Sequence, residues 1–444
     1  MESSDVKSEG VTSLPMSLHD VLLNLHQHPY PHVPNPPSCK KRASVALVIR
    51  VRPTYNDWPN SELSPLSPST ASVEQRLEAF FSQSWVQNGD PEALFIKRAS
   101  RVGDRWTGHV ALPGGKRDPT DADDREAAIR EASEEVGLDL MTDDCIYVGN
   151  LPERVVTTGW NSTPLMVLCP FVFLLTCSHS PTLRLQPTEV ASTHWVPLRA
   201  LLSPAQRTVE YVDMTQRYAK TAGLIARLSS RHLLGLMEFS AVSLKPTESL
   251  QCNSSPGLVS EGDQPVPSLL QRLKACCWDR QADPRNQNKP LLLWGLTLGI
   301  LADFLDMLPP HTAVQLWKYP TFTSPDLRLM ISVLTYKMRK QNKLQAKSES
   351  QPSNTAVDNQ TAALAVTDIA STHEQEVNIE GLGVGGHHGV SKSIGSGEHT
   401  HAVGIMLKGY YARLKIAIHI FLVWRAAIGS VAAIYAWKFF RHRR

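Results

Sequence analysis

Three glutamates on one predicted helix are the residues of this chain best suited to chemistry. Glu131, Glu134 and Glu135 follow one another at spacings that place all three on one side of a helix. Carboxylates held so close repel one another. A hard cation such as Mg²⁺ or Mn²⁺ removes that cost, because carboxylate oxygens bind it and it is shared with substrate phosphates. A solvated acidic helix face is the alternative that the spacing alone leaves open.

The residues around the glutamates favour the metal site. Arg130 adjoins Glu131 and could hold a carboxylate through two hydrogen bonds. A Gly114-Gly115 turn precedes the helix, and Gly137 is a natural stop after it. Aspartates near the start would cap free N–H groups, and an apolar stripe would face the core. These aspartates are Asp121, Asp123 and Asp124, and the stripe is Ile129, Ala132 and Val136.

Residues 114–138 resemble the Nudix box, the signature of hydrolases that cleave nucleoside diphosphates linked to another moiety. That pattern is Gly, five residues, Glu, seven residues, Arg-Glu, an aliphatic, any residue, Glu-Glu, any residue, Gly and an aliphatic. Here Asp121 replaces the first Glu, eight residues precede Arg130, and Ala132 is smaller than the usual aliphatic. The metal-binding half, 130–138, is intact. The resemblance implies that Arg130 orients Glu131 and that the metal ligands are Glu131, Glu134 and Glu135.

The stretch before the box is similar to the additional motif of Nudix coenzyme A diphosphatases. Leu94-Phe95-Ile96 predicts a strand, and basic residues, Gly108 and Leu112-Pro113-Gly114-Gly115 follow it. The motif has Phe at the position of Leu112, and its Arg-to-Gly spacing is one residue shorter. Several cations before a metal site suit coenzyme A, which carries a diphosphate and a 3′-phosphate, although an ordinary basic loop is the alternative. The predicted substrate-binding residues are Lys97, Arg98, Arg101, Gly114 and Gly115.

Two further carboxylates and a histidine are candidates for the same site. Glu189 precedes a predicted strand at 192–197, a region where Nudix enzymes often place an additional metal-binding or base carboxylate. We therefore predict a catalytic role for Glu189, with a surface acid as the alternative. Glu238 is a weaker candidate of the same kind. His109 lies between the first motif strand and the box, and its type fits a structural role as well as a ligand-facing one.

Composition excludes several classes of protein. The chain has 444 residues, of which 42% are hydrophobic, and its 45 basic and 42 acidic residues nearly balance. This indicates a globular core without the charge of a nucleic-acid-binding protein. The seven cysteines show no metal-ligand spacing, which favours reduced thiols in an intracellular compartment. Strand patterns at 44–51, 145–152, 164–175 and 192–197 flank the acidic helix and predict an α/β fold, and the resemblance implies a Nudix α/β/α sandwich.

The expected organisation has five parts. Residues 1–41, rich in Pro, Ser and His, are predicted to be disordered, and the Nudix domain is expected over 42–310. A helical extension at 311–345 and a disordered linker at 346–408 follow. The linker histidines match no closed zinc site. The apolar run at 291–301 is too short to cross a bilayer and is assigned to the core as a helix. Insertions are expected near 53–75 and 246–289.

The fifth part is a membrane tail anchor at 414–438. Ile416–Trp437 is apolar over a length that could span a bilayer, although Arg425 in its middle costs about 2.5–3.5 kcal/mol. An interfacial amphipathic helix is the alternative. Either form would hold the catalytic domain in the cytosol at a membrane through a flexible tether of about sixty residues. The peroxisome and the mitochondrion are candidate organelles.

The predicted function is metal-dependent hydrolysis of coenzyme A or acyl-coenzyme A. The expected products are adenosine 3′,5′-bisphosphate and (acyl-)4′-phosphopantetheine. Two alternatives remain open at this point: hydrolysis of another nucleoside diphosphate derivative, such as a dinucleotide or an oxidised nucleotide, and a non-catalytic nucleotide-binding module at a membrane. The complete carboxylate set argues against the second, because a pure binder would not need it. The expected partners are a small-molecule substrate and a membrane, and no nucleic acid.

Overall fold

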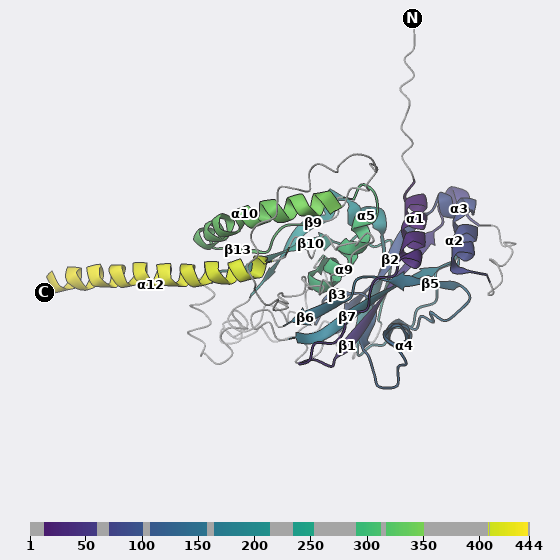
Figure 1. The fold of residues 1–444 in the computed structure, drawn as a ribbon, viewed down its shortest axis with the longest axis horizontal. Coiled ribbons are helices and arrows are strands. Elements are labelled where there is room, and N and C mark those ends of the chain that lie inside the picture. Colours follow the sequence, from purple (N-terminus) through teal and green to yellow (C-terminus); the bar gives the residue numbers. More distant parts are fainter. Residues whose placement is uncertain are drawn as a thin grey trace, which may run out of the picture.

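The central element of the fold is a nine-stranded mixed sheet (Figure 1). The computed structural model describes residues 13–59, 71–100, 107–157, 164–213, 234–252, 290–311, 317–349, 407 and 409–442. Strand β1 (Arg42–Arg52) lies at the centre, parallel to β7 (Pro164–Leu175) and antiparallel to β2 (Asp90–Arg98). These strands are rich in Val, Leu, Ile and Phe because both of their faces are buried.

The other strands complete this sheet and form a second one. The path of the first sheet is β11-β8-β2-β1-β7-β5, with β3 on β2, β4 on β1 and β6 on β7. The second sheet has the order β12-β10-β13, with β9 on β10. The bounds are β3 Val110–Ala111, β4 Gly114–Lys116, β5 Cys145–Asn150, β6 Arg154–Thr157, β8 Val190–Pro197, β9 Arg207–Val212, β10 Met237–Ser243, β11 Glu248–Gln251, β12 Leu292–Trp294 and β13 Thr321–Phe322.

Helices cover both faces of the first sheet, as the α/β/α prediction requires. Helix α4 (Asp124–Val136) packs on one face, where Ala46 and Val48 of β1 are fully buried. Leu47 and Ile49 point to the opposite face, which α1, α2 and α3 cover together with the second sheet (Figure 1). The bounds on that side are α1 Leu14–Gln27, α2 Val73–Phe81, α3 Ser84–Gln87, α5 Leu198–Leu202 and α9 Gly295–Asp306.

Several sequence expectations need correction. Disorder over 1–41 is wrong for Leu14–Gln27, which form α1, where Leu18 and Leu22 are fully buried on one face. The Pro- and His-rich composition concealed this helical stripe, and Pro15 fits the first turn of a helix. Glu248–Gln251, inside the expected insertion 246–289, form an edge strand of the main sheet. The predicted helix at 291–301 begins with strand β12 and becomes helical only at Gly295.

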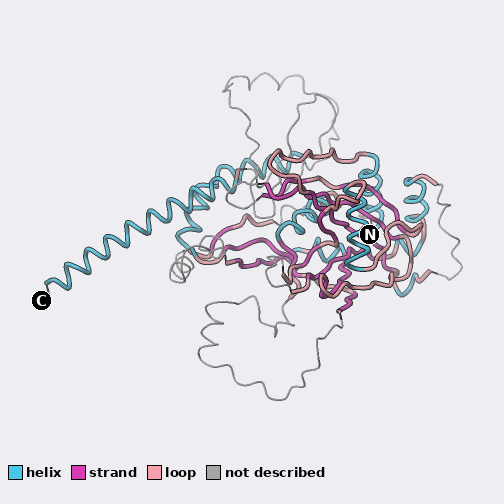
Figure 2. Tube along the Cα trace, turned by 90° about the horizontal axis from the view of Figure 1, so that it is seen from below, coloured by secondary structure: helices cyan, strands magenta, loops and turns pink. Residues whose placement is uncertain are grey.

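The C-terminal part contains two long helices, α10 (Pro325–Glu349) and α12 (Tyr410–His442). Figure 2 shows α12 leaving the rest of the protein as one continuous helix. By length and composition alone, α12 could cross a membrane. Helix α10 continues to Glu349, so the expected helical extension is longer than 311–345 and the disordered linker expected from 346 is wrong for its first four residues. Residues 350–406 of that linker, with its histidines, lie outside the described residues.

Candidate active site

The carboxylate helix packs so closely on the Gly-Gly strand that a side chain at either glycine would meet another part of the protein. Gly115 lies directly over Glu131, and a Cβ atom at this position would be 2.4 Å from the Glu131 carboxyl carbon. The N–H of Gly114 donates to Glu135 Oε2 at 2.9 Å. Gly114 also has a φ of 150°, and a Cβ there would lie 2.3 Å from the carbonyl oxygen of Ser44. The glycines expected to bind substrate therefore also position two glutamates.

Both predicted ends of the helix are confirmed. Asp123 is the N-cap and its side chain accepts a hydrogen bond from the N–H of Glu126 at 2.7 Å. Gly137 ends the helix in the left-handed conformation, with a φ of 69°. The chain then returns, and the N–H of Gln186 donates to the Glu135 carbonyl at 2.9 Å. This return brings the segment before β8 beside the last turn of α4.

Three carboxylates meet at this place. Glu131, Glu135 and Glu189 each offer an oxygen, and these oxygens all lie within 4.8 Å of one another. Glu189 comes from the turn before β8, next to an irregular register in which Arg98 of β2 pairs with Val190 but Lys97 pairs with Ser192. Such a bulge re-aims side chains beside a site. The structure thus joins Glu189 to two of the three helix glutamates.

Glu134 does not belong to this group, which differs from the predicted triad. Successive helix residues are rotated by about 100°, so Glu134 and Glu135 diverge although each lies near Glu131. Arg130 holds the largely exposed Glu134 carboxylate at 2.9 Å, one turn back along the helix. Spacing on one broad helix face was therefore not enough to place all three carboxylates at one point.

Arg130 connects the helix to the loop before it. Its Nη2 donates to Glu131 Oε1 at 3.2 Å and to the carbonyl of Lys116 at 3.1 Å, which confirms the predicted contact with Glu131. Its Nε donates to buried Asp121 at 2.9 Å, and this hydrogen bond lowers the pKa of Asp121. The substitution of Asp for Glu in the box therefore leaves a carboxylate that positions Arg130. The sequence alone had not assigned this role.

The predicted phosphate-binding cations do not all face the carboxylates. Arg98 lies near enough to Glu135 to favour its ionised form. Lys97, its neighbour on β2, instead acts on His194, because consecutive strand residues point to opposite faces. Arg101 lies outside the described residues. The His109 ring packs at a tilt against Trp294, with the ring centroids 4.9 Å apart, and Glu238 pairs with Arg328. Neither weaker candidate belongs to the group of Glu131, Glu135 and Glu189.

The electrostatics of the carboxylate group suit a cation. Burial raises the pKa of Glu135 to about 7, and repulsion from Glu131 adds to the shift while the Gly114 N–H opposes it. Burial also raises the pKa of Glu131, although Arg130 opposes that shift. Glu135 is buried and the other two carboxylates are partly buried, and carboxylates that destabilise one another's charge are the donor set that a hard divalent cation stabilises. Glu131, Glu135 and Glu189 therefore fit a metal ion.

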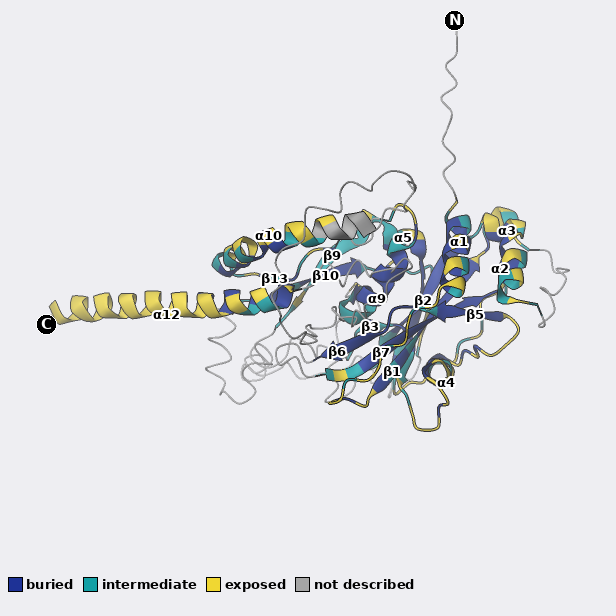
Figure 3. Ribbon diagram, viewed as in Figure 1, coloured by how far each residue is buried: buried dark blue, intermediate teal, exposed yellow. Residues whose placement is uncertain are grey.

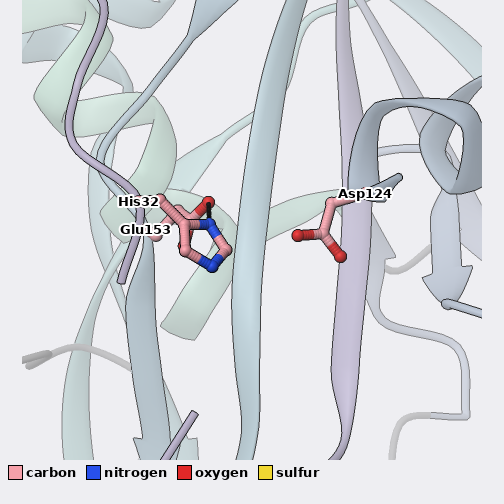
Figure 4. A group of neighbouring side chains, drawn as sticks. All are labelled: His32, Asp124 and Glu153. Carbon is pink, nitrogen blue, oxygen red and sulfur yellow. Dashed lines mark hydrogen bonds and ion pairs between the residues drawn. The ribbon is translucent and has the colours of Figure 1, made fainter. Parts of the chain in front are cut away.

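A second group, His32, Asp124 and Glu153, has similar spacing but a different role (Figure 4). The guanidinium of Arg42 lies among these side chains and donates to Asp124 at 2.7 Å and to Glu153 at 2.7 Å. It also donates to the carbonyl of Val33 at 2.9 Å. The positive charge that these carboxylates need is thus already present, and the cluster ties the start of α4 to β1.

Comparison with known proteins agrees with the site. The model of the NUDIX domain matches residues 84–218. An uncharacterised protein of Schizosaccharomyces pombe, C14C4.10c, is 32% identical over 310 residues, which cover 69% of this chain and 78% of that protein. The peroxisomal coenzyme A diphosphatase NUDT7 of Mus musculus is 53% identical over 53 residues, 12% of this chain and 22% of the mouse protein. The mouse mitochondrial coenzyme A diphosphatase NUDT8 is 46% identical over 52 residues, again 12% of this chain and 25% of that protein.

The fold, the box and these matches define a hydrolase of the pyrophosphatase type. The chain belongs to the Nudix family. Its similarity to the two mouse coenzyme A diphosphatases covers no more than a quarter of their length, so it does not establish the substrate.

The two glycines should respond differently to an added methyl group. Gly115→Ala should leave the fold intact but displace the Glu131 carboxylate, lowering metal affinity about 10–100-fold. Gly114→Ala meets backbone at a positive φ and should cost about 1–3 kcal/mol of unfolding free energy. Calorimetric metal titration and urea unfolding measure the two effects. The reverse pattern would contradict this division of roles.

The raised pKa of Glu135 predicts a pH dependence in the metal-free protein. Folding raises this pKa, so the stability contribution is full below the unfolded pKa and is lost as pH rises through about 7. Tm without metal should therefore fall between about pH 5 and about pH 8, less so in Glu135→Gln, and Mg²⁺ or Mn²⁺ should reduce the fall. An identical pH profile in wild type and Glu135→Gln would contradict the prediction.

Proposed function

We propose that the chain is a divalent-metal-dependent hydrolase of the diphosphate in coenzyme A or its thioesters. The products would be adenosine 3′,5′-bisphosphate and (acyl-)4′-phosphopantetheine. The observation that carries the proposal is the convergence of Glu131, Glu135 and Glu189 beneath the Gly-Gly strand, with Arg98 beside them. The choice of substrate is supported by the partial similarity to two coenzyme A diphosphatases and by the additional motif before the box.

Each residue of the site would have a distinct part in the reaction. Glu131, Glu135 and Glu189 would hold Mg²⁺ or Mn²⁺, which when bound neutralises diphosphate charge and lowers the pKa of a water molecule. Arg130 donates a hydrogen bond to the Glu131 carboxylate, and the Gly114 N–H donates one to an oxygen of Glu135. Arg98, which lies near Glu135, would neutralise phosphate charge, and Arg101 follows it in the sequence.

The same proposal places the enzyme at a membrane through α12, with the catalytic domain in the cytosol. The length and apolar composition of α12 support this attachment. Two relatives carry peroxisomal and mitochondrial in their names, so these organelles are the first to examine. Sedimentation of the full chain with membranes tests the attachment independently of the hydrolase activity.

Substitution of single carboxylates tests the metal-binding set. Glu131→Gln, Glu135→Gln and Glu189→Gln each remove one negative charge at nearly constant volume, and kcat should fall by roughly two or more orders of magnitude. Glu134→Gln is the matched control on the same helix, and it should retain more activity because that carboxylate pairs with Arg130 instead. Steady-state kinetics at saturating Mg²⁺ give the kcat of each variant. A loss at Glu134 as large as that at Glu135 would restore the predicted helix triad.

A comparison of two substrates tests the choice of coenzyme A. Hydrolysis of coenzyme A should have a higher kcat/KM than hydrolysis of its 3′-dephospho form, because the additional phosphate gains a cationic partner. Arg98→Ala should reduce the difference, whereas Lys97→Ala, on the opposite face, should reduce it less. Equal kcat/KM values in wild type would favour another nucleoside diphosphate derivative. A panel of dinucleotides and oxidised nucleotides would then identify it.

A further inference from the structure

Helix α12 has two halves with different surroundings (Figure 3). In the first turns, one side is buried against the rest of the protein, at Tyr410, Leu414 and Phe421. From Leu422 to His442 every residue is exposed. A helix with one buried stripe is part of a folded domain, whereas a helix that is apolar all round belongs in an apolar solvent.

The first half is fixed to α10 and to the segment before β13. The hydroxyl of Tyr410 donates to the carbonyl of Pro320, and its ring packs at a tilt against that of Tyr319, with the ring centroids 4.9 Å apart. Arg413 donates to the carbonyl of Leu334 in α10 at 3.3 Å. The buried side chains Leu327, Ile331 and Met338 of α10 belong to the same core cluster as Tyr410, Leu414 and Phe421.

The half of α12 that packs on α10, Tyr410–Arg425, is called the docked half here, and it ends at an ion pair. Arg425 Nη2 lies 2.7 Å from Asp326 Oδ2, in the first turn of α10. In the membrane span expected from the sequence, Ile416–Trp437, Arg425 lies in the middle and no partner for its charge is predicted. In the structure it has one, and every described residue of α12 after this pair is exposed.

The docked half cannot enter hydrocarbon by itself. If residues 416–425 lay in a bilayer, the adjoining first turns of α10 would enter with them. Those turns carry Asp326 and the half-exposed Arg328, which is paired with Glu238 of β10. Charged side chains within a bilayer are costly, at least about 2.5 kcal/mol each on insertion scales. Undocking α12 would instead expose Leu327, Ile331 and Met338 to water.

We propose that only the second half of α12, Ala426–Phe440, enters the bilayer, and that the docked half holds the hydrolase domain directly against the membrane surface. This rests on the membrane attachment proposed above and defines its boundary at Arg425. The occupant of the exposed apolar surface is a lipid bilayer, because the surface surrounds the helix and ends in a cluster of basic residues. These residues are Lys438, Arg441, His442, Arg443 and Arg444.

The boundary also explains the positions of the aromatic residues. Trp424 falls at the near headgroups and Trp437 toward the far ones, where tryptophan is enriched. Fifteen helical residues extend about 22 Å, against a hydrocarbon thickness of about 30 Å. Lys438 and Arg441 would extend toward the far headgroups, and a span this short fits a thin bilayer. The domain would then have a fixed height above the membrane.

Cysteine accessibility in the membrane-bound full chain tests the boundary. Ile416→Cys and Ile420→Cys replace exposed residues of the docked half, and Val431→Cys and Ile434→Cys replace exposed residues of the other half. After treatment with a membrane-impermeant maleimide, mass spectrometry reads labelling at each substituted residue. On membranes we expect labelling at 416 and 420 and no labelling at 431 and 434. Adding detergent should make 431 and 434 accessible to the label. Thermal unfolding confirms that each variant is folded.

The other outcomes are distinct. Protection of all four positions would show that the whole of 416–437 spans and would overturn the boundary, as would labelling of all four on membranes. If the full chain stays soluble, the membrane attachment itself fails, and the hydrolase assignment is unaffected.

Two truncations give an independent measurement of docking. Ending the chain after Arg425 keeps the docked turns and should give a soluble protein with the Tm of the full chain. Ending it after residue 405 removes Tyr410, Leu414 and Phe421 and should lower Tm by several degrees. Equal Tm values for the two truncated proteins would overturn the docking.

Discussion

The close approach of α4 to the Gly-Gly strand is the contact on which the site depends. The backbone of β4 lies so near the helix that the Glu131 carboxyl group occupies the space where a side chain at 115 would be. The same approach lets a backbone N–H fix Glu135. The contact therefore leaves room for one carboxylate and holds the other through a hydrogen bond. The chain then returns toward β8, and this return brings Glu189 to the same place.

The opposite end of α4 is held by charge. Arg42 of β1 is buried, and its guanidinium bonds Asp124 of the helix and Glu153 in the segment before β6. A buried ion pair of this kind adds little net stability, but removing one partner costs about 3–5 kcal/mol because it leaves an uncompensated charge. The start of the helix is therefore fixed to the central strand, while its end is fixed to the glycines. Between these two points the glutamates have little freedom to move apart.

Sequence patterns within short segments correctly predicted the strands and helix ends that those segments determine by themselves. The strands now seen as β1, β5, β7 and β8 follow from runs of β-branched and aromatic residues, and the caps of α4 follow from Asp123 and Gly137. The second sheet was not predicted, because β12 and β13 are very short and pair with β10 across long stretches of sequence. The opposite orientations of Lys97 and Arg98 follow from strand alternation, which the reading of them as one basic cluster overlooked.

Composition also could not show which part of α12 packs against the protein and which part is exposed. Ile416–Trp437 has the length and hydropathy of a span, yet those properties are shared by helices that pack inside a protein. The two cases differ in whether the apolar side chains pack against other residues. Leu414 and Phe421 pack against the core cluster that includes α10, whereas Val431 and Ile434 are exposed. Arg425 would be costly in the middle of a bilayer, but in the structure it pairs with Asp326, and at the proposed boundary it would also lie near the headgroups.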